Sequence, residues 1–386
     1  MARRIAVGID IGTHQVKVVI ASRDREEPAP RILGVGMAES KGLRHGYIIN
    51  STDVSRSIRK AVLQAEKTAG MKVKSAYLGI GGVGLDEVTA HGEMTISRAD
   101  SEVSDFDISK VQGEAEKKIA SQILNRRVLH AIPLHYAIDG SEVLGHPQGM
   151  KGAKLEVDML FVTCLERHLE DIISAVEALG IEVEDVMASP IAGSLVTLTK
   201  AQKIAGVVLA NIGAETVSII IFENNVPISL KVFPTGASDI TNDIALGLKV
   251  SIEEAEQIKR GALTGTEFPK KKLDAIIISR LSDLFELIQT HLKKIGKKEL
   301  LPAGVVITGG GSGLATIEDI ARASLALPSK IGALSLPQGS MIKDSTWAVS
   351  YGLCIWGLSA EQDSFGIALA KQTGGSVWGW LKQFLP

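Results

Sequence analysis

The chain has 386 residues, 45% of them hydrophobic, which is enough apolar material for a large core in two or more lobes. Its formal net charge is −2 and no basic block is interleaved with aromatic residues, so nucleic acid is not an expected partner. The two cysteines, Cys164 and Cys354, form no CxxC motif, which fits a reducing cytoplasm, and no apolar run reaches the roughly 20 residues of a membrane-spanning helix.

The first residues predict an α/β fold that begins with a strand hairpin. Ile5–Ile9 and Val16–Ala21 are β-rich runs joined by the tight turn DIGTHQ. A helix is predicted over Asn50–Gly70, because a capping Asn is followed by apolar residues at helical spacing. Ala76–Ile80 then has the pattern of a buried strand and ends at two glycines.

From about residue 84 to 162 the pattern of apolar and polar residues changes, which predicts an inserted subdomain. Polar strand-like stretches surround one helix, expected over Asp107–Leu124, and the stretch LHAIPLHYAID alternates as a strand does. Its His130 and His135 do not fit a metal site, because their spacing suits neither a helical i,i+4 pair nor a second ligand cluster. After the insertion, a helix is predicted over Glu166–Leu179, and a glycine follows it.

The second half of the chain repeats the opening pattern. Strands are predicted at Gly206–Leu209 and Thr216–Phe222 around the turn ANIGAE, so strand, polar turn and strand occur near residue 10 and again near residue 212. The elements predicted after this hairpin are helices over Ile240–Leu248, Ser251–Lys259 and Lys271–Ile295, and a strand over Val305–Ile307 that runs into TGGGSGL and another helix.

The first hairpin turn has the residue types of a phosphate site. Gly12 lets backbone N–H groups approach a phosphate, the Thr13 hydroxyl adds a donor, and Asp10 can hold Mg²⁺ through water. Lys17, at the start of the next strand, can reach the same phosphates as a point charge. A single turn of this kind is often no more than a hairpin, so the indication rests on the turns that follow.

Two further turns complete the set. Asn211, Gly213 and Thr216 stand in the equivalent place half a chain later, and two such hairpins can clamp one polyphosphate between them. The third turn, Thr308–Ser312, ends a strand and is expected to open a helix whose N–H groups contact the nucleotide. None of these is a Walker A or GxGxxG motif.

In this order the three turns resemble the ATPase fold shared by actin, Hsp70 and hexokinase. The helical pair Glu256-x-x-Lys259 strengthens that resemblance, which implies a role for the pair around ribose and adenine; the alternative is an ordinary solvated charge pair. The nucleotide contacts that the resemblance implies are Asp10, Gly12, Thr13, Lys17, Asn211, Gly213, Thr216, Gly236, Glu256, Lys259, Gly309, Gly310, Gly311 and Ser312. The cofactors implied are ATP and Mg²⁺.

The end of the chain, SVWGWLKQFLP, holds two of the four tryptophans. On a helical wheel its apolar side chains share an arc of roughly 160°, with Gly379, Lys382 and Gln383 opposite. The segment 359–376 before it has no sustained period and reads as a tether. A helix that inserts in the membrane interface and one that docks on its own domain both fit. The residues of the apolar arc are Val377, Trp378, Trp380, Leu381, Phe384 and Leu385.

Longer stretches narrow the resemblance to the FtsA family, the bacterial cell-division homologues of actin. They are KGLRHGYIINSTDVSRSIRKAVLQAEKTAG, HAIPLHYAIDG with GHPQGMKGAKLEVDMLFVT, GASDITNDIALGLKVSIEEAEQIK and VVITGGGSGL. The resemblance implies an ATP-binding adaptor that polymerises on the cytoplasmic face of the membrane at the division site. It also implies that the terminal helix is a membrane anchor, and that the C-terminal peptide of FtsZ and other division proteins are partners.

The resemblance also implies a division into subdomains. The expected bounds are 1–84 with 163–203 and 345–358 for the first lobe core, 85–162 for the inserted subdomain, 204–234 with 300–344 for the second lobe core, 235–299 for its smaller subdomain, 359–376 for the linker and 377–386 for the anchor helix. The FtsZ peptide would bind the 235–299 subdomain.

This sequence departs from the family at the second turn, where many relatives have Asp-Ile-Gly-Gly-Gly-Thr. Asn211 cannot supply a second carboxylate for Mg²⁺, and Glu215 puts a negative charge near phosphate unless it points away. We therefore expect ATP binding with at most slow hydrolysis. Two alternatives remain at this level: a pilus-assembly protein like PilM, which has the same fold without an anchor helix, and a small-molecule kinase of the superfamily, for which no candidate base is found.

Overall fold

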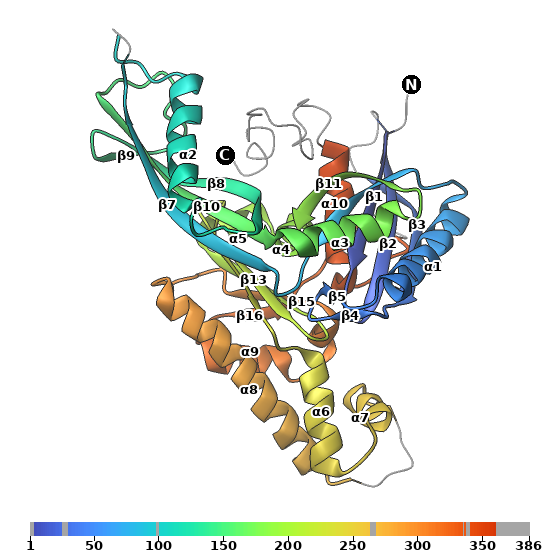
Figure 1. Ribbon diagram of the computed structural model, residues 1–386. Helices are drawn as coiled ribbons and strands as arrows, with labels where there is room; N and C mark the ends of the chain where they lie inside the picture. Colours follow the sequence, from blue (N-terminus) through green and yellow to red (C-terminus); the bar gives the residue numbers. More distant parts are fainter. Residues whose placement is uncertain are drawn as a thin grey trace.

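The computed structural model describes residues 4–24, 30–97, 100–262, 268–334, 336 and 340–359. The chain forms two lobes, each built on a five-stranded sheet, and a smaller sheet with one helix that projects from the first lobe (Figure 1). The predicted linker beyond Ser359 and the predicted anchor helix over 377–386 lie outside the described residues.

The first sheet carries the hairpin predicted at the start of the chain. β1 pairs antiparallel with β2 and β2 with β3, whereas β6 and β11 add to β1 in parallel. In order across the sheet, the strands are β3 (Arg31–Glu39), β2 (Gln15–Arg23), β1 (Arg4–Ile11), β6 (Ser75–Ile80) and β11 (Glu182–Ala188).

The second sheet repeats this topology strand for strand. Three antiparallel strands are again followed by two parallel ones, so the predicted long-range repeat is confirmed as a duplicated sheet. In the same order the strands are β14 (Val226–Phe233), β13 (Val217–Glu223), β12 (Val207–Ile212), β15 (Val305–Thr308) and β16 (Ser329–Ile331).

The helix predicted after the first hairpin is α1 (Ser51–Ala69), and its ends form as expected. The Asn50 side chain accepts a hydrogen bond from the Asp53 N–H (3.2 Å), and Gly70 closes the helix with a φ of 69°. α1 packs directly on β3, where Gly36 leaves no space for a side chain: a Cβ there would lie 1.8 Å from the Ala61 carbonyl oxygen. The short strands β4 (Leu43–Arg44) and β5 (Tyr47–Ile48) precede the helix.

The other helices of the first lobe cover both faces of its sheet. α1 and α3 (Glu166–Glu177) contact each other on one face, while α4 (Ser189–Thr197) and α10 (Ala348–Ser359) contact each other on the opposite face. α10 carries apolar residues on every side, and ten of its twelve residues are buried, which is the pattern of a core helix. α5 (Lys200–Ala205) leads into the second lobe.

The inserted subdomain consists of one helix on one four-stranded antiparallel sheet. α2 (Asp105–Ile119) begins with a capping box at Ser104 and packs against Gly92, where a Cβ would lie 2.3 Å from the Val111 carbonyl oxygen. The strand predicted in LHAIPLHYAID is confirmed as part of β8. In order across the sheet the strands are β7 (Leu85–Thr95), β10 (Lys154–Leu165), β8 (Arg126–Ile138) and β9 (Ser141–Val143).

The second lobe carries its helices on the far side of its sheet from the insertion (Figure 1). They share a core with the sheet through residues such as Ile244, Phe285 and Ile307. The elements are α6 (Ala237–Leu248), α7 (Ile252–Lys259), α8 (Lys270–Lys294), the 3₁₀ turn η1 (Gly310–Gly313) and α9 (Ile317–Leu325). A second 3₁₀ turn, η2 (Ser345–Trp347), leads directly into α10 of the first lobe.

Four helix predictions need correction. The helix expected from Ile240 begins three residues earlier, because α6 starts at Ala237 directly after Gly236. The helix expected to reach Leu124 stops at Ile119, because the next residues fold into a turn that leads to Asn125, whose φ is 59°. The helix expected to reach Leu179 ends at Glu177 and is closed by turn hydrogen bonds before Gly180. The TGGGSG turn does not open an α-helix: it is a 3₁₀ turn, and α9 begins only at Ile317.

Candidate functional site

A cleft of about 690 Å³ lies between the two lobes, where the turns of both hairpins meet. A separate groove of about 790 Å³ lies between α1 and α3 and contains none of the predicted residues. The cleft is lined from the first lobe by residues 10–15, Lys17, Gly46, Gly81, Gly82, Ser189 and Thr346, and from the second by Asn211, Gly213, Ala214, Thr216, Ser218, Ala237, Ser238, Thr241, Asn242, Ile252, Glu253, Glu256, Lys259, Arg260, Gly309, Gly310, Gly311, Gly313 and Leu314.

The two hairpin turns have the same backbone geometry. In the first, the Gly12 N–H donates to the Gln15 carbonyl oxygen (3.1 Å); in the second, the Gly213 N–H donates to the Thr216 carbonyl oxygen (2.8 Å). Added Cβ atoms would lie 3.0 and 2.9 Å from those same carbonyl oxygens, so both positions suit glycine. The turns therefore present equivalent backbone surfaces from opposite sides of the cleft.

The first turn carries a pair of opposite charges. Asp10 and Lys17 stand directly across β1 and β2, and the Lys17 ammonium donates to the Thr346 carbonyl oxygen (2.9 Å). Burial raises the pKa of Asp10 to about 6, although the positive charge of Lys17 opposes this shift. Burial also lowers the pKa of Lys17, against the attraction of Asp10 and Asp344. Lys17 alone therefore does not offset the cost of burying the ionised Asp10 carboxylate. This is the pattern expected of a carboxylate that also binds a cation from outside the protein.

The second turn is neutral at the equivalent positions. Asn211 takes the place of Asp10, and Ser218, directly across β12 and β13, takes the place of Lys17. The one acidic residue of this turn, Glu215, points away from the cleft: its carboxylate accepts a hydrogen bond from the His45 N–H (2.6 Å). The His45 ring is hydrogen-bonded to the Glu215 carbonyl oxygen as well (3.0 Å). The second turn is therefore attached to the first lobe by its own acidic residue.

The glycines of the third turn differ in the space that surrounds them. Gly309 has a φ of 89°, and a Cβ there would lie 2.4 Å from the Asn211 side-chain oxygen, so this position fixes how β15 meets β12. Gly310 faces open space, with no atom within 4 Å of an added Cβ. Ser312 is buried, and its hydroxyl donates to the Gly309 carbonyl oxygen (2.7 Å). Gly310 is thus the member of this turn that a bound molecule would meet.

A charged cluster on α6 and α7 forms another part of the cleft. Glu256 pairs with Lys259 (2.6 Å) and Arg260 (2.7 Å), and it accepts a hydrogen bond from the Thr241 hydroxyl (2.7 Å). Burial would raise the pKa of Glu256, but hydrogen bonds from these three residues outweigh it and hold the pKa at about 2. Lys259 also donates to the Ala237 carbonyl oxygen (3.0 Å). The pair is therefore a fixed, partly buried feature of the cleft and differs from a solvated helical ion pair.

All of the predicted nucleotide contacts line the cleft except Gly236 and Ser312. Ser312 holds the third turn together from inside. Gly236 lets α6 approach the second turn, because a Cβ there would lie 2.4 Å from the Ala214 carbonyl oxygen. Gly46, Thr241 and Thr346 also line the cleft and were not predicted, because no local motif marks them; Arg260 could have been found as the i+4 neighbour of Glu256.

The two histidines considered for a metal site have separate partners. His130 is buried, and its Nε2 accepts a hydrogen bond from the Ala188 N–H (3.0 Å); burial lowers its pKa to about 3. His135 lies on the exposed face of the inserted sheet and pairs with Asp158 (2.6 Å). Among the described helices, none is long and apolar enough to cross a bilayer.

Two family models match the chain. Residues 208–352 match the model described as cell division protein FtsA, and residues 82–163 match the SHS2 domain inserted in FtsA; together they cover more than half of the chain. Curated relatives agree. The cell division protein FtsA of Pseudomonas aeruginosa is 29% identical over 95% of this chain and 92% of its own length. That of Escherichia coli K12 is 26% identical over 99% of this chain and 96% of its own length.

Solved structures confirm the predicted actin-like two-lobed fold. The PilM–PilN type IV pilus biogenesis complex matches with a TM-score of 0.68 at 16% identity, covering 92% of this chain and 98% of that chain. MreB5 of Spiroplasma citri bound to AMPPNP matches with a TM-score of 0.51 at 12% identity, covering 93% and 98%. At these identities the likeness concerns the fold alone, whereas the sequence matches all lead to one family of cell-division proteins.

Proposed function

The chain belongs to the FtsA family of cell-division proteins, and from this premise we propose that it binds ATP with Mg²⁺ between its lobes and polymerises on the cytoplasmic face of the membrane. In this proposal it attaches FtsZ to the membrane at the division site. The observation that carries the nucleotide part is the meeting of two equivalent glycine turns across one cleft, with Asp10 and Lys17 on one side and the open Gly310 on the other. The similar MreB5 structure contains AMPPNP, a nucleotide analogue.

The residues of the cleft fit a nucleotide with its metal. Gly12, Gly213 and Gly310 leave backbone surfaces that phosphate oxygens can approach, and Lys17 can supply a positive charge. Asp10 would hold Mg²⁺ through water, which relieves the cost of a buried, ionised carboxylate. Bound Mg²⁺ supplies charge neutralisation of the phosphates. Thr241, Glu256 and Lys259 would face the ribose and adenine end.

Hydrolysis is proposed to be slow, so that ATP acts mainly as an assembly ligand. Phosphoryl transfer depends on positioning and charge neutralisation, and the second turn provides no metal-binding carboxylate at Asn211. Glu215 does not replace it, because its carboxylate is engaged with His45. Binding and phosphate release should be measured separately: tight ATP binding with release below about 1 per second supports the proposal, and faster release contradicts it.

Attachment to FtsZ and to the membrane belongs to other parts of the chain. We place the FtsZ peptide on the smaller subdomain of the second lobe, over residues 235–299, where Leu246 and Ile278 leave apolar side chains exposed. The anchor is proposed to be the terminal segment with Trp378 and Trp380, joined by the 359–376 linker. The other subdomain bounds stay predictions.

The alternatives are weaker for specific reasons. The likeness to PilM is one of fold at 16% identity, while the family models and curated relatives are cell-division proteins. A small-molecule kinase needs a free carboxylate beside its substrate. Three acidic residues line the cleft. Asp10 lies on the first hairpin turn, Glu253 lies on α7 in the other lobe, and the Glu256 carboxylate is engaged by Lys259, Arg260 and Thr241.

Electron microscopy of the protein on a lipid monolayer tests the whole proposal. Filaments on the lipid with ATP, and none without nucleotide, are expected for the full chain. Trp378→Ala should release the filaments from the lipid while leaving assembly intact, because an indole carries much of the interfacial burial of a short helix. Lipid-bound filaments that persist in that variant would remove the tail from the proposal.

The anchor is further proposed to work by avidity. Interfacial burial of six apolar side chains is largely offset by the cost of ordering about nine residues at roughly 1.5 kcal/mol each. Each further tail of a filament binds as an effectively intramolecular event, so weak anchors add up. Protein kept monomeric by an interface substitution should therefore sediment poorly with liposomes. Equal sedimentation of monomer and polymer would show that one tail suffices.

A further inference from the structure

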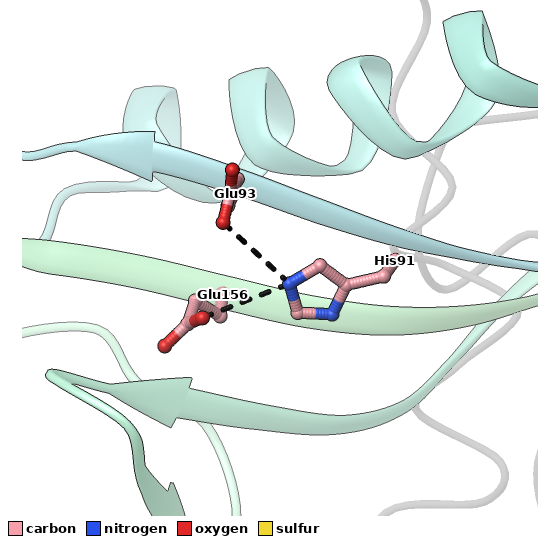
Figure 2. A group of neighbouring side chains, drawn as sticks. All are labelled: His91, Glu93 and Glu156. Carbon is pink, nitrogen blue, oxygen red and sulfur yellow. Dashed lines mark ion pairs between the residues drawn. The ribbon is translucent and has the colours of Figure 1, made fainter.

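The exposed face of the inserted sheet carries a cluster of ligand-type side chains that the proposed function does not use. β7 and β10 are adjacent strands, and their alternate residues point to opposite faces. Gly92, Met94, Leu155 and Val157 lie on the face covered by α2. His91, Glu93 and Glu156 lie on the other face, with their side chains directed toward one another (Figure 2).

The register places like charges directly opposite each other. Glu93 stands across from Glu156, and His91 stands across from Asp158. Facing carboxylates on neighbouring strands destabilise a sheet unless a cation lies between them. Of the three carboxylates of this row, Glu93 and Glu156 share the ammonium group of Lys154, whereas Asp158 contacts the rings of His91 and His135. The row therefore keeps an excess of negative charge when the imidazoles are neutral.

The orientation of His91 matches that of a metal-bound imidazole. Its Nδ1 is hydrogen-bonded to the Asp158 carboxylate (2.9 Å), which leaves the lone pair of Nε2 for another partner. Nε2 lies 3.6 Å from Glu156 Oε1 and 3.9 Å from Glu93 Oε2. A carboxylate that orients the second ring nitrogen is the usual partner of a histidine that binds a metal.

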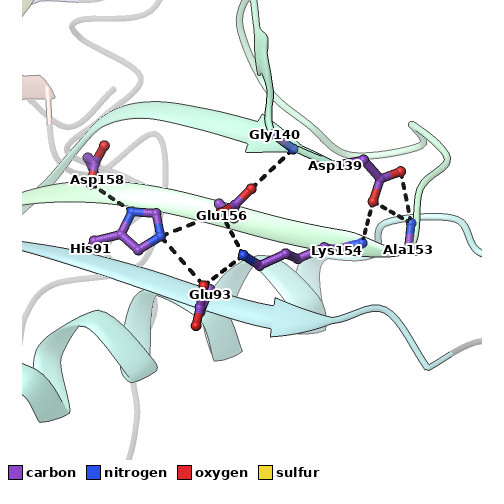
Figure 3. Close-up of polar contacts among 8 residues, drawn as sticks. All are labelled: His91, Glu93, Asp139, Gly140, Ala153, Lys154, Glu156 and Asp158. Carbon is purple, nitrogen blue, oxygen red and sulfur yellow. Dashed lines mark hydrogen bonds and ion pairs between the residues drawn. The ribbon is translucent and has the colours of Figure 1, made fainter.

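The same two carboxylate oxygens already hold a cation. The Lys154 ammonium lies 2.7 Å from Glu93 Oε2 and 2.8 Å from Glu156 Oε1 (Figure 3). Glu156 is fixed further by the Gly140 N–H (3.2 Å), and the Lys154 N–H donates to Asp139 (2.8 Å). The backbone positions are thus set independently of the ammonium, whose flexible side chain can leave.

From this arrangement we propose a divalent transition-metal site on the inserted subdomain, with His91 Nε2, Glu93 and Glu156 as ligands. Their ligand atoms lie within 4.8 Å of one another. Zn²⁺ with bonds of about 2.0–2.1 Å separates tetrahedral ligands by roughly 3.3–3.5 Å, so small side-chain shifts bring these atoms into range. Asp158 orients His91, and the Lys154 ammonium is the competitor that the ion displaces. A bound ion joins β7 to β10 and neutralises the facing glutamates.

Titration calorimetry of the tag-free full chain with Zn²⁺, in buffer with Mg²⁺ in excess to occupy oxygen-only sites, tests this proposal. We expect one Zn²⁺ equivalent in the wild type. His91→Ala and Glu156→Gln should each weaken it by about 100-fold or more, and Asp158→Asn by about 10–100-fold, as for an orienting partner. Lys154→Met should tighten it at least tenfold, since the competing ammonium is gone.

The gain expected from Lys154→Met cannot come from misfolding, and this makes it the decisive variant. His135→Ala is the matched control, because that ring lies on the same face and contacts Asp158 but lies outside the ligand set; its affinity should stay near that of the wild type. Zn²⁺ binding that is equal in the wild type, His91→Ala and Lys154→Met overturns the site. Loss in His135→Ala as large as in His91→Ala overturns this ligand set.

Discussion

The two hairpin turns of the cleft share a backbone and differ in charge. Each has a glycine N–H bonded to the carbonyl oxygen three residues on, at Gly12 and at Gly213. Opposite each other across the strands stand Asp10 and Lys17 in the first lobe, and Asn211 and Ser218 in the second. Duplication has thus kept the surface that a phosphate approaches on both sides, while one lobe alone carries the charged pair. On the proposed function, the shared backbone serves nucleotide binding, and the missing charged pair in the second lobe slows hydrolysis.

The acidic residue of the second turn has a different use. Glu215 accepts a hydrogen bond from the His45 N–H of the first lobe and so connects the lobes beside the cleft. Close packing of Gly46 on Gly82, where a Cβ would lie 2.5 Å from the Gly82 Cα, fixes the segment that carries His45. Substitutions in one turn or the other can therefore test whether the two lobes have separate roles.

A side chain added to the cleft surface of either lobe should have the largest effect. Gly310→Val projects into open space, so it should fold and place its side chain in the path of a phosphate. Gly12→Val brings a Cβ to 3.0 Å from the Gln15 carbonyl oxygen, so it should tilt the turn that the phosphate approaches. We expect ATP affinity, measured by calorimetry, to fall by about 100-fold or more, which is roughly 2.7 kcal/mol. Gly113→Val, on the open side of α2, is the control. Unchanged affinity in both cleft variants would contradict the pocket.

Asp10→Asn makes the first turn like the second. Loss of a charged partner costs about 1.5–3 kcal/mol, so Mg²⁺-dependent ATP affinity should fall by roughly 10–150-fold, while affinity in EDTA should change much less. The comparison of the two conditions by calorimetry isolates the metal contribution. Equal losses with and without Mg²⁺ would mean that Asp10 does not hold the ion.

The same substitution should stabilise the nucleotide-free fold. Because burial raises the pKa of Asp10 from 3.8 to about 6, the folded state binds a proton more tightly than the unfolded state does. Stability contributed by this group is therefore present below pH 3.8 and falls as the pH rises to about 6. At pH 7 to 8, Asp10→Asn should raise the free energy of unfolding by on the order of 1–3 kcal/mol. Urea denaturation at about pH 8 and about pH 4 checks this; a gain of equal size at both pH values would argue against ionisation as its cause.

Asn211→Asp makes the second turn like the first and should restore turnover more than affinity. A second carboxylate can help to hold the metal ion that neutralises the phosphates. We therefore expect the rate of phosphate release to rise by about tenfold, which corresponds to a barrier lower by roughly 1.4 kcal/mol. Asn242→Asp, which adds the same charge to the cleft from α6, is the matched control. A rise of similar size in both variants would point to general charge and not to the turn.

Glu215→Ala should have the smallest effect. It removes one interlobe hydrogen bond to the His45 N–H, worth about 1 kcal/mol, and leaves the phosphate-facing backbone in place. Nucleotide dissociation, followed with a fluorescent ATP analogue, should quicken by about fivefold, whereas Glu215→Gln keeps an acceptor oxygen and should stay near the wild type. Slower dissociation in the alanine variant would mean that Glu215 opposes nucleotide through its charge.

Much of the fold could be predicted because its signals are local. Periodicity and capping predicted α1, and the two apolar hairpins around polar turns predicted the duplication, since alternation and turn chemistry depend on neighbours in sequence. α10 was not predicted as a helix. Its residues are apolar on all sides, so no face distinguishes a helix from another buried segment.

The site divides in the same way. The residue types and spacing of the three turns, and the pair Glu256 and Lys259, follow from the sequence by itself, because each motif lies within one turn or one helix. Where a side chain points was decided by the tertiary structure: Glu215 turns to His45, 170 positions away, and Ser312 turns inward. The ligand cluster of His91, Glu93 and Glu156 likewise exists only because β7 and β10 pair, since strand register joins residues that no local spacing relates.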